Sequence, residues 1–198
     1  MDQMVGRNAL SVFKGRRVLV TGDTGFKGSW LCTWLHYLGA EVVGFALPPK
    51  LVDDHFNLLG LEKTIRHVEG DIRDHDTLHR VFADFRPEIF FHLAAQSLVR
   101  YSYNEPKLTF DTNVGGSVNI LECVRNCPSL RAVVYVTSDK CYLNKEWIWG
   151  YRENDELGGH DPYSASKAAA EIVFAAYADS FFRTRDTLGI ASVRAGNV

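Results

Sequence analysis

A glycine-rich turn between a strand pattern and a helix pattern is the feature that most constrains the fold of this chain. Residues 17–21 (RVLVT) have the composition of a short buried strand and run directly into GDTGFKG at 22–28. A helix is expected over about 29–38, ending at Gly39, followed by a strand over 41–47 that Pro48 stops. Together these segments have the size of one mononucleotide-binding βαβ unit.

The glycines of this turn, at positions 22, 25 and 28, suit a phosphate-binding corner. Glycine permits positive φ and close backbone approach to a pyrophosphate, while the helix N-terminus offers free N–H groups to the anion. The GxxGxxG spacing differs from the commoner GxGxxG, and alone it would equally fit a plain tight turn. Its place between a strand and a helix favours nucleotide binding. Lys27 is expected either to contact a phosphate or to lie solvated.

The rest of the chain alternates between the two kinds of pattern. Strands are expected at 65–69, 88–93, 132–137 and 189–194, and helices from Asp74 or Asp76 to 85, over 106–126 and over 163–182, with a loop up to about residue 105. This alternation predicts an α/β, Rossmann-like, doubly wound parallel sheet with helices on both faces. We expect residues 1–14 to form a leader and 15–198 one dinucleotide-binding domain.

Polar and small residues gather where the predicted strands end, and such sheets bind ligands at that edge. These residues are Thr21, Gly22, Asp71, Ala94, Ser138 and Asn197. Ala95 and Gln96 follow in a stretch with room for a flat ring or a diphosphate. His92 is expected to be a satisfied structural histidine. Gly115 and Gly116 lie inside a predicted helix, where glycine costs about 1 kcal/mol relative to alanine, so close packing or ligand approach is expected there.

Reactive side chains cluster in two segments. Ser138, Asp139 and Lys140 follow the fifth predicted strand, and Tyr163 and Lys167 stand four residues apart, which places them on one helix face. The Asp-Pro pair at 161–162 marks the start of that helix. A hydroxyl, an acid, a lysine and a Tyr/Lys pair together indicate a redox site with an additional acid/base pair.

Composition excludes several other classes of protein. The net charge is −2, without a basic stripe, so neither nucleic acid nor a membrane surface is an expected partner. No apolar run approaches the roughly 18 to 20 residues of a membrane helix, and a signal pattern is missing, so we expect a cytoplasmic protein. The four cysteines form no CxxC pair and are expected to be reduced thiols. No metal site is predicted, because the seven histidines show no ligand spacing.

The segments TGDTGFKGSW, GDIRD, HLAAQ, VTSDKCY and YSASK resemble, in order and spacing, the extended short-chain dehydrogenase/reductase family, nucleotide-sugar branch, over about residues 15–198. Within that branch, residues 26–30, 138–142 and 145–154 are similar to the 4,6-dehydratases that act on CDP-glucose. Members continue with a smaller C-terminal substrate domain, which is expected to be largely absent from this chain. They usually form homodimers through two long helices, here about 106–126 and 163–182.

The resemblance implies a role for each reactive residue. Tyr163 takes the proton of the sugar 4-hydroxyl, Lys167 holds the cofactor ribose and lowers the tyrosine pKa, and Ser138 hydrogen-bonds the 4-oxygen. Lys140 removes the C5 proton, and Asp139 protonates the departing 6-hydroxyl. The sugar nucleotide is the substrate, and a nicotinamide cofactor carries hydride from C4 to C6.

Two departures from the family pattern bear on these roles. Better-known relatives carry Asp-Glu where this chain has Asp139 and Lys140, so the lysine must be neutral to act as a base, and burial beside a cofactor is expected to lower its pKa. The pair is expected to share one proton. The second strand ends without the acid that selects NAD, at residues 44–47. NAD is expected because oxidation comes first, with weak selectivity against NADP.

The full set of expected ligand contacts follows from the motifs and the resemblance. Cofactor contacts are expected from Gly22, Thr24, Gly25, Phe26, Lys27, Gly28, Asp71, Ile72, Leu93, Ala94, Ala95, Thr137, Tyr163 and Lys167, and substrate contacts from Gln96, Ser138 and Asn197. Trp147 and Trp149 are expected either in the core or in the wall of the sugar pocket.

Alternative functions are a nucleotide-sugar 4-epimerase, a dehydratase of another sugar nucleotide, and a non-catalytic dinucleotide-binding module. An epimerase has no need of an acid/base pair at 139–140.

Overall fold

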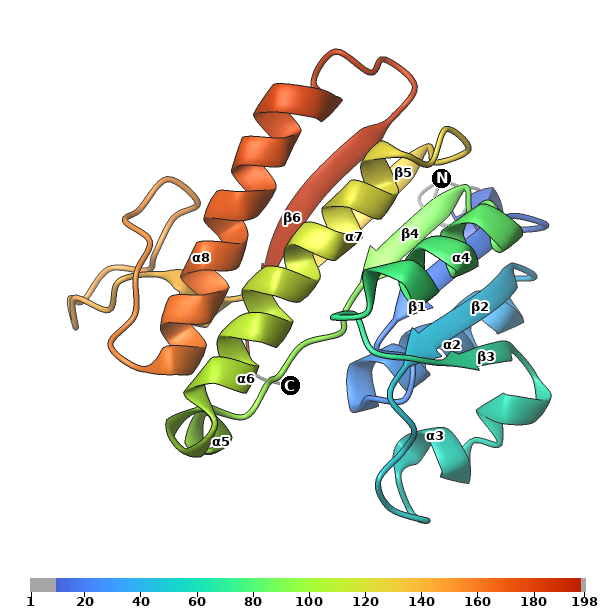
Figure 1. The fold of residues 1–198 in the computed structure, drawn as a ribbon, viewed down its shortest axis with the longest axis horizontal. Helices are drawn as coiled ribbons and strands as arrows, with labels where there is room; N and C mark the ends of the chain where they lie inside the picture. The colour runs from blue at the N-terminus through green and yellow to red at the C-terminus, as the bar shows by residue number, and fades with distance from the viewer. Residues whose placement is uncertain (1–9, 197–198) are drawn as a thin grey trace, which may run out of the picture.

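A six-stranded parallel sheet forms the centre of the computed structural model, which describes residues 10–196 (Figure 1). The strands are β1 Arg17–Thr21, β2 Glu41–Ala46, β3 Arg66–Glu69, β4 Ile89–His92, β5 Ala132–Ser138 and β6 Gly189–Ala195. Their order is β3-β2-β1-β4-β5-β6, with every neighbouring pair parallel. This is the order of two mononucleotide-binding halves that meet between β1 and β4, so the predicted doubly wound fold is confirmed.

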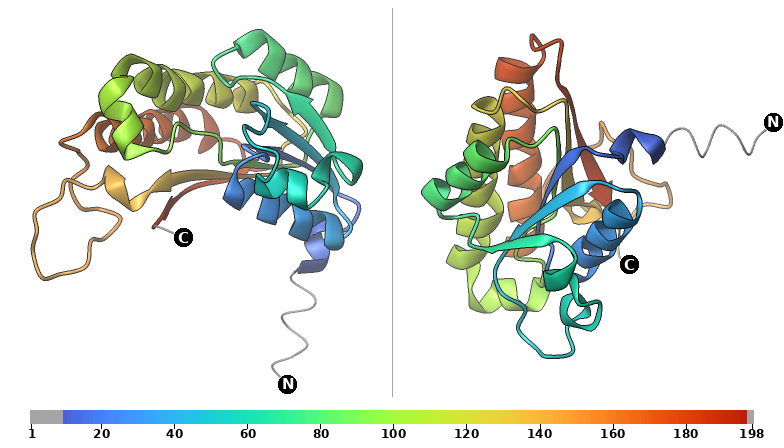
Figure 2. Two further views of the ribbon diagram at one scale, coloured as in Figure 1. Left: turned by 90° about the horizontal axis from the view of Figure 1, so that it is seen from below. Right: turned by 90° about the vertical axis from the view of Figure 1, so that its right-hand side faces the viewer.

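Helices cover both faces of the sheet (Figure 2). The α-helices are α2 Phe26–Tyr37, α3 His55–Leu58, α4 His75–Phe85, α5 Val99–Asn104, α6 Pro106–Phe110, α7 Gly116–Arg125 and α8 Pro162–Tyr177. Short 3-10 turns are η1 Leu10–Phe13, η2 Leu61–Lys63 and η4 Asp139–Cys141, and the π-helical segments are η3 Asp111–Gly115 and η5 Ala178–Phe182. Side chains of α4, α7 and α8 pack on one face, and those of α2 and α3 pack on the other.

Alternation along β1 divides its side chains between two hydrophobic cores. Leu19 packs with the cluster that includes Phe90 and Tyr135, whereas Val18 and Val20 pack with the cluster under α2. All five side chains are almost fully buried. A strand covered on both faces is expected to be apolar throughout, which explains the unbroken hydrophobic run that precedes the glycine turn.

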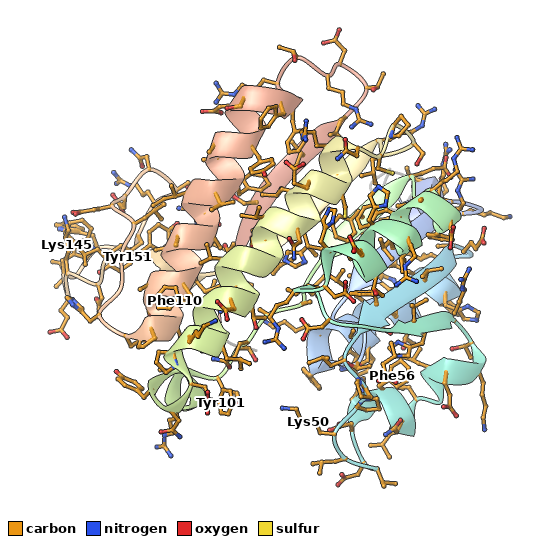
Figure 3. The ribbon with its side chains drawn as sticks, viewed as in Figure 1. Lys50, Phe56, Tyr101, Phe110, Lys145 and Tyr151 are labelled. Carbon is orange, nitrogen blue, oxygen red and sulfur yellow. The ribbon has the colours of Figure 1, made fainter. Side chains whose placement is uncertain are left out.

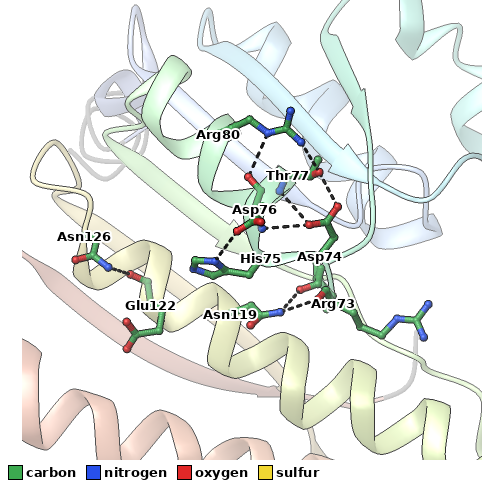
Figure 4. A network of polar contacts seen from close by, with 10 residues as sticks. Arg73, Asp74, His75, Asp76, Thr77, Arg80, Asn119, Glu122 and Asn126 are labelled. Atoms are coloured by element: carbon green, nitrogen blue, oxygen red, sulfur yellow. Dashed lines mark hydrogen bonds and ion pairs between the residues drawn. The ribbon is translucent and has the colours of Figure 1, made fainter.

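The turn between β3 and α4 is tied to α7 by polar contacts (Figure 4). Asp74 caps α4, as predicted, because its carboxylate accepts hydrogen bonds of 3.1 Å from the amides of Asp76 and Thr77. Asn119 of α7 donates to the carbonyls of Ile72 and Arg73, at 3.0 and 3.1 Å. The loop that carries GDIRD is thus fixed against a helix of the second half of the sheet.

The long helix predicted over 106–126 exists, but a π-helical segment, η3, interrupts it. A Cβ on Gly116 would lie 2.6 Å from Cδ1 of Ile72, so the predicted close packing is confirmed at this glycine. At Gly115 an added Cβ would meet no atom within 4 Å. Only one of the two glycines is therefore required by packing.

Two local predictions were wrong. The helix after the glycine turn begins at Phe26 rather than at about Ser29, because Gly25 already serves as its N-cap. The segment before residue 105, predicted as a loop, contains the two-turn helix α5. Its start is held by Gln96, whose side-chain oxygen accepts from the amide of Leu98 at 2.6 Å. The predicted strand limits agree with the structure to within one residue at every end.

The four cysteines are buried free thiols, as predicted. Burial raises the pKa of Cys141 to about 11 and that of Cys123 to about 12, which makes these thiols poor nucleophiles. Among residues 10–196 there is no helix with the length and apolar character required to cross a bilayer.

Candidate active site

Backbone contacts fix the glycine turn at the end of β1. Gly22 has φ of +78°, and a Cβ there would lie 2.8 Å from the amide nitrogen of Ala94, which follows β4. A Cβ on Gly28 would lie 2.0 Å from the carbonyl oxygen of Gly22. The turn therefore folds against itself and against the end of β4, and only glycine fits at these two positions.

The start of α2 is suited to bind an anion. Gly25 is its N-cap, and within residues 10–196 no side chain caps the first turn, so the leading amides are available to a ligand. Thr24 donates to the carbonyl of Leu47 at 2.9 Å, which ties the turn to the end of β2. Lys27 is exposed and donates to the carbonyl of Gly196 at 3.2 Å, so its ammonium lies near the end of β6.

Asp23 is a fully buried acid that the sequence analysis did not single out. Its Oδ2 lies 2.7 Å from Nδ1 of His67, and a Cβ on Gly44 would lie 2.0 Å from the same oxygen. No hydrogen-bond partner for its Oδ1 is found among residues 10–196. The β2 strand carries no acid of its own at its end. The turn after β1 instead places Asp23 against Gly44 of β2.

The GDIRD segment lies at the end of β3, as predicted. Arg73 binds both carboxylate oxygens of Asp71, each 3.0 Å from Nε, and this hydrogen bonding keeps the pKa of Asp71 below its usual value. Ile72 is buried, and its side chain packs against Gly116 of α7. Phe26, on the opposite side of the sheet, is exposed and its ring lies 5.4 Å from that of His55.

The hydroxyl of Thr21 holds the residues that follow β4. The amides of Leu93 and Ala94 lie 3.2 and 3.4 Å from the hydroxyl of Thr21. The same hydroxyl is 2.7 Å from Nδ1 of His92, and burial lowers the pKa of His92 to about 3, so the ring is neutral. His92 is thus a satisfied structural histidine, as predicted.

Gln96, predicted to contact substrate, uses its side chain within the protein. Its amide nitrogen donates to Thr109 at 2.9 Å, and its backbone exchanges hydrogen bonds of 2.8 and 2.9 Å with the side chain of Asn113. Asn113 also donates to Ser166 of α8 at 2.9 Å. Ala95 lies in the same segment between β4 and α5, and Asn197 falls outside the described residues.

Ser138 ends β5 and begins η4. Its hydroxyl accepts from the amide of Lys140 at 3.2 Å and donates to Asp139 at 3.1 Å. Helix α8 starts at the predicted Asp-Pro pair, where Asp161 accepts from the amide of Ser164 at 3.0 Å. The end of β5 and the start of α8 lie close together, because η4 packs directly on α8.

Tyr163 and Lys167 lie on the same face of α8, and each is 7% exposed. Burial lowers the pKa of Lys167 to about 8, although the charge of Glu171 acts in the opposite direction. Burial also raises the pKa of Tyr163, while a hydrogen bond with Ser138 lowers it. The loss of solvent around the phenolate is the largest influence, so the net shift of the Tyr163 pKa is upward, and the lowering expected from the charge of Lys167 beside the cofactor stays a prediction.

Asp139 and Lys140 lie beside this pair but are not buried. Their charged atoms are 3.7 Å apart, and their side chains are 45% and 49% exposed. The expected burial of Lys140 is therefore absent here. Both side chains line a cavity of about 920 Å³, together with Tyr142, Tyr151 and Arg194 among others.

The loop between η4 and α8 forms the outer wall of this cavity. Figure 3 places Lys145 and Tyr151 together in that loop, and Tyr151 stacks on Tyr142 with ring centroids 5.2 Å apart. Trp147 packs beside Tyr151 at 5.4 Å but is 39% exposed, and Trp149 is more exposed still. The core interpretation of the two tryptophans is therefore wrong.

Two polar residues of this region were missed by the sequence analysis. Glu171 is buried and accepts a hydrogen bond from Thr137, which lies next to Ser138. Arg194 of β6 pairs with Glu171 at 2.9 Å. The spacing of 163, 167 and 171 was a usable signal for Glu171, because steps of four keep a residue on one helix face.

Comparisons with known proteins agree with this arrangement. Residues 19–191 match the GDP-mannose 4,6 dehydratase family. The chain is 52% identical over 190 residues to CDP-glucose 4,6-dehydratase from Salmonella typhimurium, covering 94% of this chain and 53% of that protein. It is 32% identical to CDP-paratose 2-epimerase from Salmonella typhi, covering 83% of this chain and 54% of that protein. The chain spans about half the length of the curated relatives it matches.

Solved structures share the same fold. The UDP-glucose 4-epimerase of Thermus thermophilus, in complex with NAD, has a TM-score of 0.73 and 30% identity, covering 90% of this chain and 54% of that one. The epimerase Mth375 of Methanothermobacter thermautotrophicus has a TM-score of 0.82 and 26% identity, covering 98% of this chain and 55% of that one. From its fold, its motifs and these matches, the chain belongs to the GDP-mannose 4,6 dehydratase family, within the extended short-chain dehydrogenases/reductases.

Proposed function

We propose that this chain forms the dinucleotide-binding and catalytic part of a CDP-glucose 4,6-dehydratase, which converts CDP-D-glucose to CDP-4-keto-6-deoxy-D-glucose and water. The observation that carries the proposal is the Asp139–Lys140 pair beside Ser138 and Tyr163, in a chain 52% identical to a CDP-glucose 4,6-dehydratase. The smaller substrate domain of such an enzyme would lie outside residues 15–198.

NAD is the proposed cofactor, and the structure offers a place for it. The corner formed by Gly22 and Gly28 excludes any Cβ, and the uncapped amides of α2 suit a pyrophosphate. Asp71 and Lys167 would hold the adenosine and the nicotinamide ribose. When bound, NAD supplies a hydride acceptor that later becomes the donor. Selectivity against NADP is proposed to be weak, because β2 ends without an acid.

Each reactive side chain then has one proton to move or hold. Tyr163 accepts the proton of the 4-hydroxyl, and Ser138 hydrogen-bonds the same oxygen. The 4-ketone acidifies C5, so neutral Lys140 removes the C5 proton, and Asp139 in its acid form protonates the 6-hydroxyl as it leaves as water. In that state the pair holds one proton in total, on Asp139 rather than on Lys140.

A nucleotide-sugar 4-epimerase is the main alternative, because several structural relatives have that name. Epimerisation needs Ser138, Tyr163 and Lys167 but neither Asp139 nor Lys140. A dehydratase of another sugar nucleotide would share all five residues. A non-catalytic dinucleotide-binding module would need none of them, and the Asp139–Lys140 pair in a cavity next to the buried Tyr163 and Lys167 supports an enzyme.

The experiment is mass spectrometry of CDP-glucose incubated with NAD and the whole gene product. A product lighter by one water supports the dehydratase, and UDP-glucose and GDP-mannose in parallel reactions identify the preferred nucleotide. An unchanged mass with a changed chromatographic retention would replace the proposal with an epimerase. An unchanged substrate, with NAD binding intact, would replace it with a binding module.

We further propose a cytoplasmic homodimer that supplies deoxysugars for a surface polysaccharide such as lipopolysaccharide O-antigen. The buried free thiols suit a reducing compartment. Ile172 and Phe181 are exposed apolar side chains along α8 and η5, and Phe110 is another in α6, so a partner helix pair could cover them. Sedimentation of the protein and of Ile172→Glu tests the dimer, since the variant should shift to monomer.

A further inference from the structure

Glu171 continues the row of catalytic residues along α8. It follows Lys167 by four residues and Tyr163 by eight, so the three side chains lie on one helix face. Its side chain is almost completely buried, with only 3% of its surface exposed. A carboxylate removed from water in this way requires hydrogen bonds or charge partners to remain ionised.

Strands β5 and β6 supply the partners of Glu171. Oε1 accepts a hydrogen bond from the hydroxyl of Thr137, and Oε2 accepts from Arg194 at 2.9 Å and from Ser192 at 3.2 Å. The acid therefore joins α8 to the two strands whose ends form the site. Thr137 is the residue directly before Ser138, so its contact with Glu171 also fixes the end of β5.

Arg194 extends this contact into the cavity wall. Its guanidinium lies 4.8 Å above the ring of Tyr142, and it donates to the carbonyl of Glu153 at 2.8 Å. Tyr142 in turn stacks on Tyr151. One guanidinium thus links the buried acid to the loop that encloses the cavity.

Lys167 is surrounded by few charges that could stabilise its ammonium. Lys27 from α2 is a second cation, His92 from β4 is neutral, and the thiol of Cys141 from η4 is protonated because burial raises its pKa to about 11. Within residues 10–196, Glu171 is the carboxylate that lies one helical turn from Lys167; both side chains are almost completely buried, so its charge favours the ammonium. The protonation of Lys167 therefore depends on the charge of Glu171.

We propose that Glu171 and Arg194 form a positioning pair, in which Glu171 keeps Lys167 protonated while Arg194 holds the aromatic wall of the sugar cavity. Neither residue is catalytic, since each acts through another side chain. The inference rests on the proposed function for the use of the cavity, but the effect of Glu171 on Lys167 is a property of the protein alone.

The first test measures the protonation of Lys167 directly, by NMR titration of lysine side chains in the protein without substrate or cofactor. The Lys167 signal is assigned by its loss in Lys167→Arg. We expect a midpoint near pH 8 in the native protein and a midpoint lower by about one unit or more in Glu171→Gln. Asp179→Asn, which breaks an exposed ion pair with Arg183, is the matched control and should leave the midpoint unchanged. An unchanged midpoint in Glu171→Gln would overturn the proposal.

The second test separates the two members of the pair by their kinetics. Arg194→Lys keeps the charge on Glu171 compensated but loses the planar group over Tyr142, so KM for the sugar nucleotide should rise about tenfold while kcat and the Lys167 midpoint stay unchanged. Glu171→Gln should instead move the alkaline limb of kcat to lower pH. The same loss in both variants, without this division, would show a merely structural ion pair and overturn the proposal.

A variant without either charge keeps the test valid if Glu171→Gln does not fold. In the double variant Glu171→Gln/Arg194→Met, no unpaired guanidinium is left beside the neutral Gln. The Lys167 midpoint should still fall. Failure of the dehydratase assay in the native protein would reject the proposed function but would not alter this titration. The two proposals can therefore fail independently.

Discussion

The glycine corner and the acid/base end of the crevice are built in opposite ways. At the corner, backbone atoms are in contact, and a single added carbon at Gly28 would lie 2.0 Å from a carbonyl oxygen. At the other end, Asp139 and Lys140 are half exposed, and a loop with exposed aromatic rings encloses them. The corner can hold a ligand of only one shape, whereas the chemistry of the other end depends on charge and on what covers it.

The largest expected effect is a loss of kcat in a variant that keeps the shape of the site next to the acid/base end. Tyr163→Phe removes one hydroxyl from a buried ring, so kcat should fall about a thousandfold, within the usual range for loss of a general base. NAD affinity and the melting temperature should stay close to native values. Stopped-flow absorbance of reduced NAD measures the first step, and native-like hydride transfer would contradict the role of Tyr163.

The second effect tests the shape of the corner. Gly28→Ala should lower the free energy of unfolding by about 3 kcal/mol and abolish NAD binding, because backbone atoms cannot move away from the new Cβ. Gly189→Ala, at the start of β6 and away from the turn, is the matched control, since its nearest contact would be 3.7 Å. Urea denaturation and calorimetric titration with NAD measure both effects. Equal losses in the two variants would disprove the contact argument.

The third effect concerns pH and the neutral His92 between the two ends. An unfolded histidine binds a proton below about pH 6.5, whereas burial keeps the folded pKa at about 3, so stability is lost as pH falls from about 6.5. From pH 7 to pH 5 the loss should be about 2 kcal/mol. Urea denaturation of His92→Asn should show a much smaller loss, and exposed His36→Asn serves as control. Equal slopes for His92→Asn and the native protein would contradict this assignment.

A smaller effect is expected from exchanging the charge at the exposed end. Lys140→Glu places the acid of better-known relatives at a half-exposed position, so dehydration should be retained to within about tenfold, and stability should change by about 0.5 kcal/mol or less. Mass spectrometry of the product measures the elimination. Total loss of activity in a folded protein that still binds NAD would show that this end is as constrained as the corner.

The smallest effect compares two adjacent glycines in one helix. Gly115→Ala should stabilise the protein by up to about 1 kcal/mol, because its Cβ would meet nothing within 4 Å. Gly116→Ala should not, because Ile72 must first move away. Thermal unfolding of both variants decides the matter, and a gain at Gly116 would contradict the packing derived for this position.

The sheet and the corner were predictable because their signals are local. Unbroken apolar runs, glycines at fixed spacing and the Asp-Pro pair at 161–162 specify strands, a turn and a helix start without reference to distant residues. The short helix α5 gave no such signal, because Gln96 fixes its start and no side chain of its own cap does so. The π-helical segment at 111–115 gave no local signal either, and it packs against α8.

The reactive residues were predictable by type but not by environment. Ser138, Tyr163 and Lys167 lie together as their spacing suggested, yet Lys140 is 49% exposed, in a cavity whose wall includes Tyr151 and Arg194. Glu171 and Arg194 meet only after α8 and β6 pack together. Electrostatic surroundings of this kind arise from contacts between distant segments, which a pattern along the chain does not contain.

The position of Asp23 over Gly44 has a consequence for how relatives of this chain can diverge. Any side chain at position 44 would place its first carbon 2.0 Å from the Asp23 carboxylate, and loss of that carboxylate would leave His67 without its partner. The residues at these two positions cannot be substituted independently. Alanine at position 44 becomes acceptable only after position 23 carries a smaller residue. In an alignment of homologues, positions 23, 44 and 67 should therefore change as a coupled group, and single exchanges should be rare.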